Sequence, residues 1–359
     1  MPPVRTVSKA CPGQEPAQIR MNRQGPQIAA ICCKETDMTH PTLFVGIDVA
    51  KAKFDVALLN PDGKYRSKAY PNTPEGYRQF LEWLIQHEAR EAHLCMETTG
   101  AYGRGLARFL AQQQLLVSVV NPAQIHAFGK TELTRAKTDK ADARLIARYC
   151  RMHRPAPWVP PAEEIVVLQA LVQRLEDLLA LQTMEHNRLE SAEGPARKSV
   201  EAHLEFITQQ IRIVRLQIEI HIDNHPDLKS QQELLSSIPG IGDNTAATLL
   251  AFLHPLDRFH SVKQVVAYAG LNPRIRQSGQ WAGKTPIAKA GNALLRKALY
   301  LPAVVAKQHN PVIAAFCDRL LINGKRPMQV VVAAMRKLLH LAFGVLKSGK
   351  PFNPKLGVA

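Results

Sequence analysis

Four acidic residues occupy places from which their carboxylates could hold a divalent metal ion: Asp48, Glu97, Asp139 and Asp142. Asp48 and Glu97 each end an apolar, strand-like run, and Asp139 and Asp142 stand three residues apart on one face of an expected helix. Neighbouring carboxylates repel one another, and a bound divalent cation reverses that balance. The chain has a net charge of +16, and a carboxylate–metal centre within a basic surface indicates chemistry on phosphodiesters.

The four acids offer only hard oxygen ligands, without Cys or His. Mg²⁺ is therefore the expected ion, with Mn²⁺ as the alternative. Two such ions would sit about 4 Å apart and stabilise both the attacking and the leaving oxygen. Each acid also has an ordinary explanation, because Asp48 could cap a turn, Glu97 could begin a helix, and Asp139 could be an N-cap with Asp142 in the first turn. The set of four acids indicates a metal site more specifically than any one of them does alone.

Ser278 is a candidate nucleophile in a loop that ends with Gly279. A serine that attacks a phosphate must lose its proton, and the charge that develops must be neutralised. The basic residues nearby suit the second need. A polar hydrogen-bonding loop is the alternative, and spacing alone favours it. The basic residues expected to contact nucleic acid in this region are Arg274, Arg276, Lys284 and Lys289, with Lys51 and Lys137 near the acids.

The segment Ile238-Pro239-Gly240-Ile241-Gly242 precedes a helix expected to begin near Asn244. It is similar to the helix-hairpin-helix turn of DNA-binding proteins. Gly240 and Gly242 would let backbone N–H groups approach a phosphate, and the start of the next helix favours anions. The alternative is a tight helix–helix turn without a ligand. In so basic a chain we favour contact with DNA.

The elements that must position the acids lie in residues 42–154, where strand and helix signals alternate. Strands are expected at 43–49, 54–59, 64–70, 93–97 and 115–120. Helices are expected at 74–88, 102–113, from Pro122 onward, and at 139–153. Three strands followed by alternating helices and strands predict a mixed sheet of the ribonuclease-H type. The fold class is therefore α/β for this domain, plus α for the rest.

Residues 155–228 are expected to form a proline-rich linker and two long helices, which separate near Gly194. The second helix carries an apolar seam at heptad spacing, which requires a partner helix. That partner is either another chain or the preceding helix, and both alternatives stay open. The seam consists of Val200, Leu204, Ile207, Ile211, Val214, Ile218 and Ile222.

The remaining segments complete the expected organisation. Residues 229–348 predict a mostly helical domain, and 349–359 a tail. Residues 1–41 are rich in Pro, Gln and Arg without a sustained period, which is typical of a disordered extension. We take Met38 or Met21 as a hypothesis for the functional start.

The bulk composition limits the class of protein. A chain of 359 residues with 46% hydrophobic content has real cores and room for two or three domains. The six Cys form no C-x-x-C pair, which favours a reducing cytoplasm. The most apolar stretch, 330–346, is interrupted by Arg336, Lys337 and His340, and the N-terminus lacks a signal-peptide pattern. We therefore expect no membrane partner.

A set of short motifs follows one order along the chain. They are Gly46-Ile47-Asp48-Val49-Ala50-Lys51, Glu97-Thr98-Thr99-Gly100, Asn121-Pro122, Lys137-Thr138-Asp139-Lys140-Ala141-Asp142-Ala143, Ile238-Pro239-Gly240-Ile241-Gly242, Ala269-Gly270-Leu271 and Ser278-Gly279.

As a set, these motifs resemble the DEDD-type insertion-sequence transposases, the family of bridge-RNA-guided recombinases. The resemblance covers residues 42–353 and leaves out the first 41. It implies a RuvC-like domain with the tetrad Asp48, Glu97, Asp139 and Asp142, and a C-terminal transposase domain whose serine nucleophile matches Ser278. It also implies a covalent 5′-phosphoserine intermediate and an active site composed of the acids of one protomer and the serine of another.

The resemblance further implies the partners: donor and target DNA, a structured noncoding guide RNA that selects both sites, and homodimers that assemble into a tetramer. A bacterial, cytoplasmic location with association to the nucleoid is expected. Two alternatives remain beside this interpretation. One is a metal-dependent, RuvC-like junction-resolving endonuclease, and the other is a non-catalytic nucleic-acid-binding protein on the same scaffold.

Overall fold

The computed structural model describes residues 41–357 apart from 98–99, 101, 133–138, 276, 279–280 and 284. The expected N-terminal extension lies outside the described residues, as do Lys137, Arg276 and Lys284. The chain divides into two compact units, the first ending at Pro157 and the second beginning at Trp158. Each unit is described by itself.

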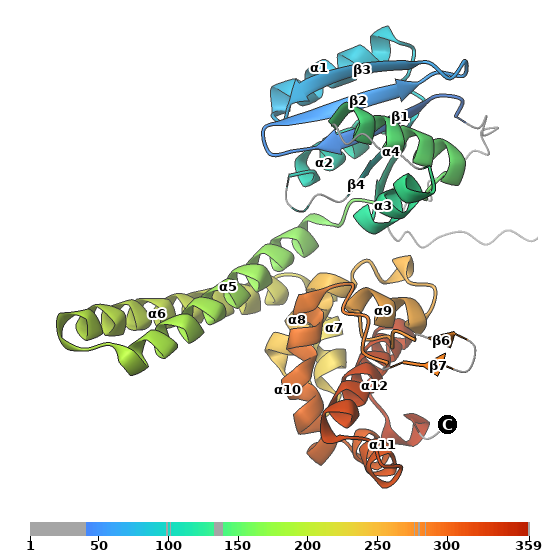
Figure 1. Ribbon diagram of the computed structural model, residues 1–359. Helices are drawn as coiled ribbons and strands as arrows, with labels where there is room; N and C mark the ends of the chain where they lie inside the picture. Colours follow the sequence, from blue (N-terminus) through green and yellow to red (C-terminus); the bar gives the residue numbers. More distant parts are fainter. Residues whose placement is uncertain are drawn as a thin grey trace, which may run out of the picture. The chain divides into compact units, whose positions relative to one another are not determined.

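The first unit is built on a five-stranded mixed sheet in the order β3-β2-β1-β4-β5 (Figure 1). β1 pairs antiparallel with β2, and β2 with β3, whereas β1, β4 and β5 run parallel. This topology confirms the predicted mixed sheet. The strands are β1 (Phe44–Val49), β2 (Lys53–Leu59), β3 (Tyr65–Pro71), β4 (His93–Glu97) and β5 (Val117–Val120).

The tight turn between β2 and β3 explains why these strands form a hairpin. The N–H of Asn60 donates to the carbonyl of Lys64 at 3.0 Å, and the N–H of Gly63 donates to the carbonyl of Asn60 at the same distance. Gly63 has φ +81°, a left-handed conformation that glycine adopts without strain. The turn therefore sets the register that pairs Leu59 of β2 with Tyr65 of β3.

Helices cover both faces of this sheet. Gly46 of β1 faces Ala57 of β2, and α4 (Asp139–His153) lies directly against Gly46. Phe54 of β2 differs from Ala57 by three positions, so it points to the opposite face. There it contacts Phe80 of α1 (Pro74–Gln86), with ring centroids 5.6 Å apart. The remaining helices of the unit are α2 (Arg104–Gln112) and α3 (Pro122–Thr131).

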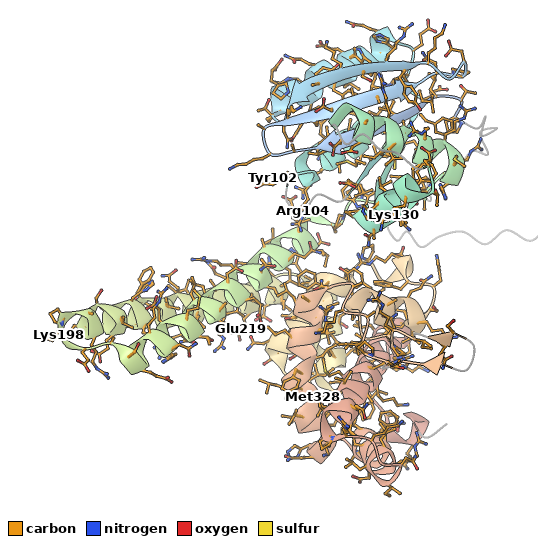
Figure 2. All side chains as sticks on the ribbon, in the orientation of Figure 1. Tyr102, Arg104, Lys130, Lys198, Glu219 and Met328 are labelled. Atoms are coloured by element: carbon orange, nitrogen blue, oxygen red, sulfur yellow. The ribbon has the colours of Figure 1, made fainter. Side chains whose placement is uncertain are left out.

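A long helical hairpin opens the second unit. α5 (Glu163–Ser191) and α6 (Gly194–Asp223) lie side by side (Figure 1). The predicted seam is the inner face of α6: Ile207, Ile211 and Ile218 are buried with Leu168 and Val172 of α5 in one core. The alternative of an intramolecular hairpin is thus confirmed for this seam. In Figure 2, Lys198 marks the tip at which α6 begins.

The rest of the second unit is mostly helical, as predicted. The base of the hairpin packs on α8, where the Gln169 side-chain amide donates to the carbonyl of Ala251 at 2.7 Å. The elements are α7 (Pro226–Ser236), α8 (Asp243–Leu253), η1 (Leu256–Arg258), α9 (Val262–Ala269), β6 (Gln277–Ser278), β7 (Trp281–Ala282), α10 (Ala293–His309), α11 (Pro311–Ile322), α12 (Pro327–Ser348) and η2 (Pro354–Gly357).

Among the described residues, α12 alone has the length and hydropathy of a membrane-crossing helix, with a mean hydropathy of 1.5 over its most apolar window. Half of that window is buried inside the protein. Val330, Leu338 and Ala342 are fully buried in the core of the second unit. The apolar character of α12 is therefore explained by its place in that core.

Candidate active site

Asp48 and Glu97 lie at the carboxyl ends of neighbouring parallel strands. The register of β1 and β4 pairs Gly46 with Cys95 and Ile47 with Met96, so Asp48 and Glu97 are the next residues on each strand. Each lies two positions beyond Gly46 or Cys95, and alternate residues of a strand share a face. Both acids therefore point to the face of the sheet that α4 covers. Each is partly exposed.

The direction of α4 brings its first turn to the same end of the sheet. The Cys150 thiol contacts the carbonyl of His93, where β4 begins, at 3.5 Å. Ala143 and Ala147 lie over Gly46, further along the strands. Going back four residues from Ala143 covers about 6 Å of helix, and going forward two residues from Gly46 covers about 7 Å of strand. The start of α4 thus reaches the level of Asp48 and Glu97.

The remaining two acids belong to this first turn. Asp139 is the first residue of α4, and its side chain lies outside the described residues. Asp142 is partly exposed. Among the side chains that the structure describes, no group of three or more His, Cys, Asp or Glu is close enough to hold a metal. The donor types fit Mg²⁺, and the backbone brings all four positions to one end of the sheet, but metal binding by the tetrad stays a prediction.

Asp55 is an acid beside this site that the sequence analysis did not single out. It faces Asp48 across the β1–β2 pair, is only 5% exposed, and pairs with the Lys53 ammonium at 2.9 Å. A buried charge requires such a partner. The signal in the sequence was an acid in the otherwise apolar run 54–59, where a strand buried on both faces has no place for an unpaired charge.

Ser278 lies on a short β-hairpin of the second unit, exposed and paired with Trp281. The ribbon continues below it, since the N–H of Arg274 donates to the carbonyl of Pro286 at 2.7 Å and Pro273 pairs with Ile287. Ser278 therefore stands near the end of a projecting ribbon, while the acids lie in the first unit. The sequence predicted a loop here, and the hairpin is the finer description.

The basic residues expected to contact nucleic acid are exposed where the structure describes them. Lys51 follows β1 by two residues, and Arg274 lies in the ribbon that carries Ser278. Lys289 has φ +55° and is held by a bond from its N–H to the carbonyl of Gly270 at 3.2 Å. Their exposure is compatible with phosphate contacts, which stay a prediction.

The glycine-rich turn before α8 has one glycine with a packing role. Gly240 has φ +104°, and an added Cβ would lie 2.8 Å from the Ala306 Cβ and 2.9 Å from the Pro302 carbonyl of α10. Gly242, the N-cap of α8, has open space around it. Close helix packing explains Gly240, as the alternative interpretation of this turn supposed. Gly242 remains available for the predicted phosphate contact.

A mixed sheet in this strand order, with acids at the carboxyl ends of its two central parallel strands and a helix over the same face, defines a ribonuclease-H-like α/β domain. Comparison with known families extends this class to the whole chain. Residues 45–192 match the model of DEDD transposases of the IS110 type, described as "Transposase". Residues 232–318 match the "Transposase IS116/IS110/IS902 family".

Individual relatives agree with these matches. The chain is 32% identical over 317 residues to the "Pilin gene-inverting protein" of Moraxella lacunata, covering 87% of this chain and 98% of that protein. The protein of the same name from Moraxella bovis gives the same identity and coverage. An IS110 insertion-element protein of Streptomyces coelicolor is 27% identical over 158 residues, or 44% of this chain and 38% of that protein. The chain belongs to the IS110 family of transposases, which are DNA-acting enzymes.

Proposed function

We propose that this chain is an insertion-sequence recombinase that cuts and rejoins DNA through a covalent 5′-phosphoserine intermediate at Ser278. Asp48, Glu97, Asp139 and Asp142 would hold Mg²⁺, which when bound supplies positive charge to a phosphoryl oxygen. The observation that carries the proposal is that Asp48 and Glu97 share the face of the sheet that α4 covers, at the level of its first turn. Ser278 is exposed on a ribbon that can reach a substrate.

The proposed step balances without an external energy source. The Ser278 Oγ forms a bond to phosphorus, the bond from phosphorus to the 3′ oxygen breaks, and the 3′ oxygen takes a proton as it leaves. The serine proton passes to solvent or to a substrate oxygen. Attack by a new 3′ hydroxyl on the phosphoserine reverses the step and joins a different strand, with one phosphodiester made for each one broken.

Single substitutions test this assignment in a DNA-cleavage assay. Ser278→Ala should abolish cleavage, and Asp48→Asn should lower its rate by several orders of magnitude, because each removes a group that acts on the reacting phosphate. Ser261→Ala is the matched control: Ser261 is also exposed and makes no capping hydrogen bond. Cleavage that persists in Ser278→Ala would instead support the junction-resolving endonuclease. If neither the wild-type protein nor any variant cleaves DNA, the result would support the non-catalytic alternative.

The outcome of strand exchange depends on how the two DNA sites are arranged. The Moraxella relatives are named for inverting a pilin gene. Inversion and transposition need the same pair of steps, cleavage and rejoining, applied to sites in different arrangements. The reaction proposed for this chain covers both outcomes.

RNA guidance is part of the proposal. It is supported by the family resemblance and by the net charge of +16, which suits backbone contacts to both DNA and a structured RNA. We propose that a noncoding RNA pairs with donor and target DNA in the bacterial cytoplasm, at the nucleoid. Sequencing the RNA that co-purifies with the protein tests this: one discrete RNA with loops complementary to both sites is expected, and random fragments would contradict it.

A composite active site requires at least two protomers, and we propose a homodimer that assembles into a tetramer. The inner seam of α6 is occupied by α5, so it cannot also join two chains. The outer face of α6 carries a second apolar stripe at heptad spacing, in which Phe206 is 56% and Ile213 41% exposed, followed by Leu216 and Ile220. A second copy of the same helix would bury this stripe.

A further inference from the structure

Asn72 links the turn that follows Asp48 to Tyr102. Its side-chain amide donates to the carbonyl of Ala50 at 3.0 Å and to the carbonyl of Tyr102 at 3.2 Å. Its backbone N–H donates to the carbonyl of Ala52 at 2.9 Å. One residue at the end of β3 therefore contacts the chain just beyond β1 and the chain beyond β4.

These two contacts lie close in sequence to the acids. Ala50 is two residues beyond Asp48, and Tyr102 is five residues beyond Glu97. Tyr102 is labelled at the surface of the first unit in Figure 2. The amide of Asn72 has two hydrogens, and each serves one of the two carbonyls. A change at this residue would remove both hydrogen bonds at once.

The orientation of Asn72 is itself fixed. The Tyr77 hydroxyl donates to the Asn72 Oδ1 at 2.7 Å, so the amide nitrogen must face the two carbonyls. The Tyr77 ring packs against those of Phe54 and Phe109, at 6.0 and 5.7 Å between centroids. Burial raises the pKa of Tyr77, which keeps its hydroxyl protonated as a donor.

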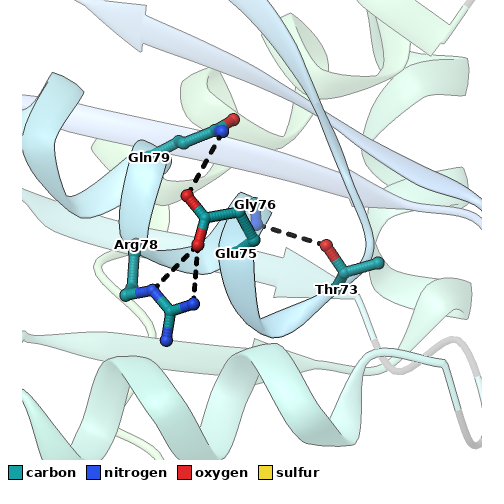
Figure 3. A network of polar contacts seen from close by, with 5 residues as sticks. All are labelled: Thr73, Glu75, Gly76, Arg78 and Gln79. Atoms are coloured by element: carbon teal, nitrogen blue, oxygen red, sulfur yellow. Dashed lines mark hydrogen bonds and ion pairs between the residues drawn. The ribbon is translucent and has the colours of Figure 1, made fainter.

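The start of α1 provides a rigid base directly after Asn72 (Figure 3). The Thr73 hydroxyl caps the helix by accepting from the N–H of Gly76 at 3.3 Å, and Glu75 pairs with Arg78 at 2.6 Å. A Cβ on Gly76 would lie 2.0 Å from the Pro71 carbonyl, so the chain before Asn72 lies tightly against the helix. The residues on both sides of Asn72 are thus held in place.

We propose that Asn72 is a positioning residue for the carboxylate site, holding the turn that follows Asp48 in place through the carbonyls of Ala50 and Ala52. This inference rests on the proposed function, since it assumes that the acids hold a metal together. Asn72 touches neither substrate nor metal in this role. Removing a group that orients a metal ligand typically lowers the metal affinity 10–100-fold.

The test measures binding of Mn²⁺, an electron-spin-resonance probe for the Mg²⁺ site, to the purified full-length protein. Asn72→Ala should weaken binding by about tenfold or more. Asn72→Asp keeps the acceptor for Tyr77 but lacks the amide hydrogens, and it should weaken binding at least as much. Ser118→Ala is the control, because Ser118 is buried in the same unit and its hydroxyl lies within hydrogen-bond distance of the carbonyls of Pro155 and Ala156, at 2.8 and 2.9 Å.

The outcomes separate this inference from the proposed function. Wild-type affinity in Asn72→Ala or Asn72→Asp, or an equal loss in Ser118→Ala, would overturn the role of Asn72. Asp48→Asn should lose Mn²⁺ binding. If Asp48→Asn alone weakens binding, the metal site stands and the positioning role fails, whereas unchanged affinity in Asp48→Asn removes both.

Discussion

Gly46 determines how closely α4 approaches the acids. A Cβ at this position would lie 2.0 Å from the Ala143 carbonyl oxygen and 2.3 Å from the Ala147 backbone nitrogen. Both contacts are to helix backbone, which cannot rotate away as a side chain would. The Gly-Ile-Asp sequence therefore serves two purposes. The glycine lets α4 pack closely against β1, and the aspartate two residues later faces the first turn of α4.

Gly46→Ala should consequently destabilise the first unit by about 3 kcal/mol or more, because overpacking against a backbone forces the helix to move. Urea unfolding followed by Trp fluorescence measures this change. Gly344→Ala in α12 is the control, since nothing lies within 4 Å of the added Cβ. Alanine there should be neutral or stabilise by up to about 1 kcal/mol. Equal effects of the two substitutions would refute the close contact.

His93 illustrates how burial at single residues sets the pH dependence of folding. It is buried at the start of β4, and its Nε2 lies 2.7 Å from the Ser118 hydroxyl. Burial, with a further contribution from Arg154, lowers the pKa of His93 from its ordinary value of 6.5. Burial likewise lowers the pKa of His254 and His340. The imidazole of His340 is itself buried at Nε2 without a hydrogen bond among the described residues.

These shifts predict lower stability at acidic pH. A base whose pKa is lower in the folded state binds more protons when unfolded, so stability rises with pH between the two values. The stability contributed by the uncharged imidazoles is fully present above about pH 6.5. It is lost as the pH falls from there through the lower pKa values of the folded protein. Urea unfolding should give a smaller free energy at pH 5.5 than at pH 7.5, and equal or greater stability at pH 5.5 would contradict this.

At the scale of elements, the sequence predicted α4 and β4 with the bounds observed, because capping acids and apolar runs mark their ends. It predicted Asp48 and Glu97 as strand-end acids for the same reason. It could not predict that Asp55 lies beside Asp48, since this depends on the register that the turn at 50–52 gives β1 and β2. Nor could the heptad seam of α6 identify its partner, because apolar spacing specifies a buried stripe and not the chain that buries it.

The observed hairpin predicts opposite results for two isoleucines of α6. Ile211 is buried against α5, and Ile213 is exposed. Ile211→Ala should cost about 2–5 kcal/mol, whereas Ile213→Ala should stay within about 0.5 kcal/mol of the wild type under conditions that keep the protein monomeric. Thermal unfolding of the two variants gives the comparison. A larger loss for Ile213→Ala would mean that the helix is rotated relative to the structure.

At the scale of the whole molecule, the acids and the serine belong to different compact units. The sequence predicted both sets of residues, but the hairpin that presents Ser278 was not evident, since a ribbon of two-residue strands gives little periodic signal. The resemblance implied a composite site. An exposed serine on a ribbon suits that arrangement, and the arrangement in turn requires assembly of several chains.

Assembly through the outer face of α6 can be tested by charge insertion. Phe206→Glu combined with Ile213→Glu should shift the protein toward monomers in sedimentation experiments, because two like charges would face each other across a symmetric contact. Leu301→Glu on α10 is the control, as Leu301 is an exposed apolar residue of the same unit. Monomers produced equally by the control, or oligomers unchanged by the double substitution, would contradict this contact.

The central claim is that DNA becomes linked to Ser278. The most direct measurement is mass spectrometry of peptides from protein that has been denatured during reaction with DNA, Mg²⁺ and its co-purified RNA. We predict a nucleotide attached through its 5′ phosphate to the peptide that contains Ser278, and its absence in both Ser278→Ala and Asp48→Asn. An adduct on any other residue, or DNA cleavage without an adduct, would contradict the account.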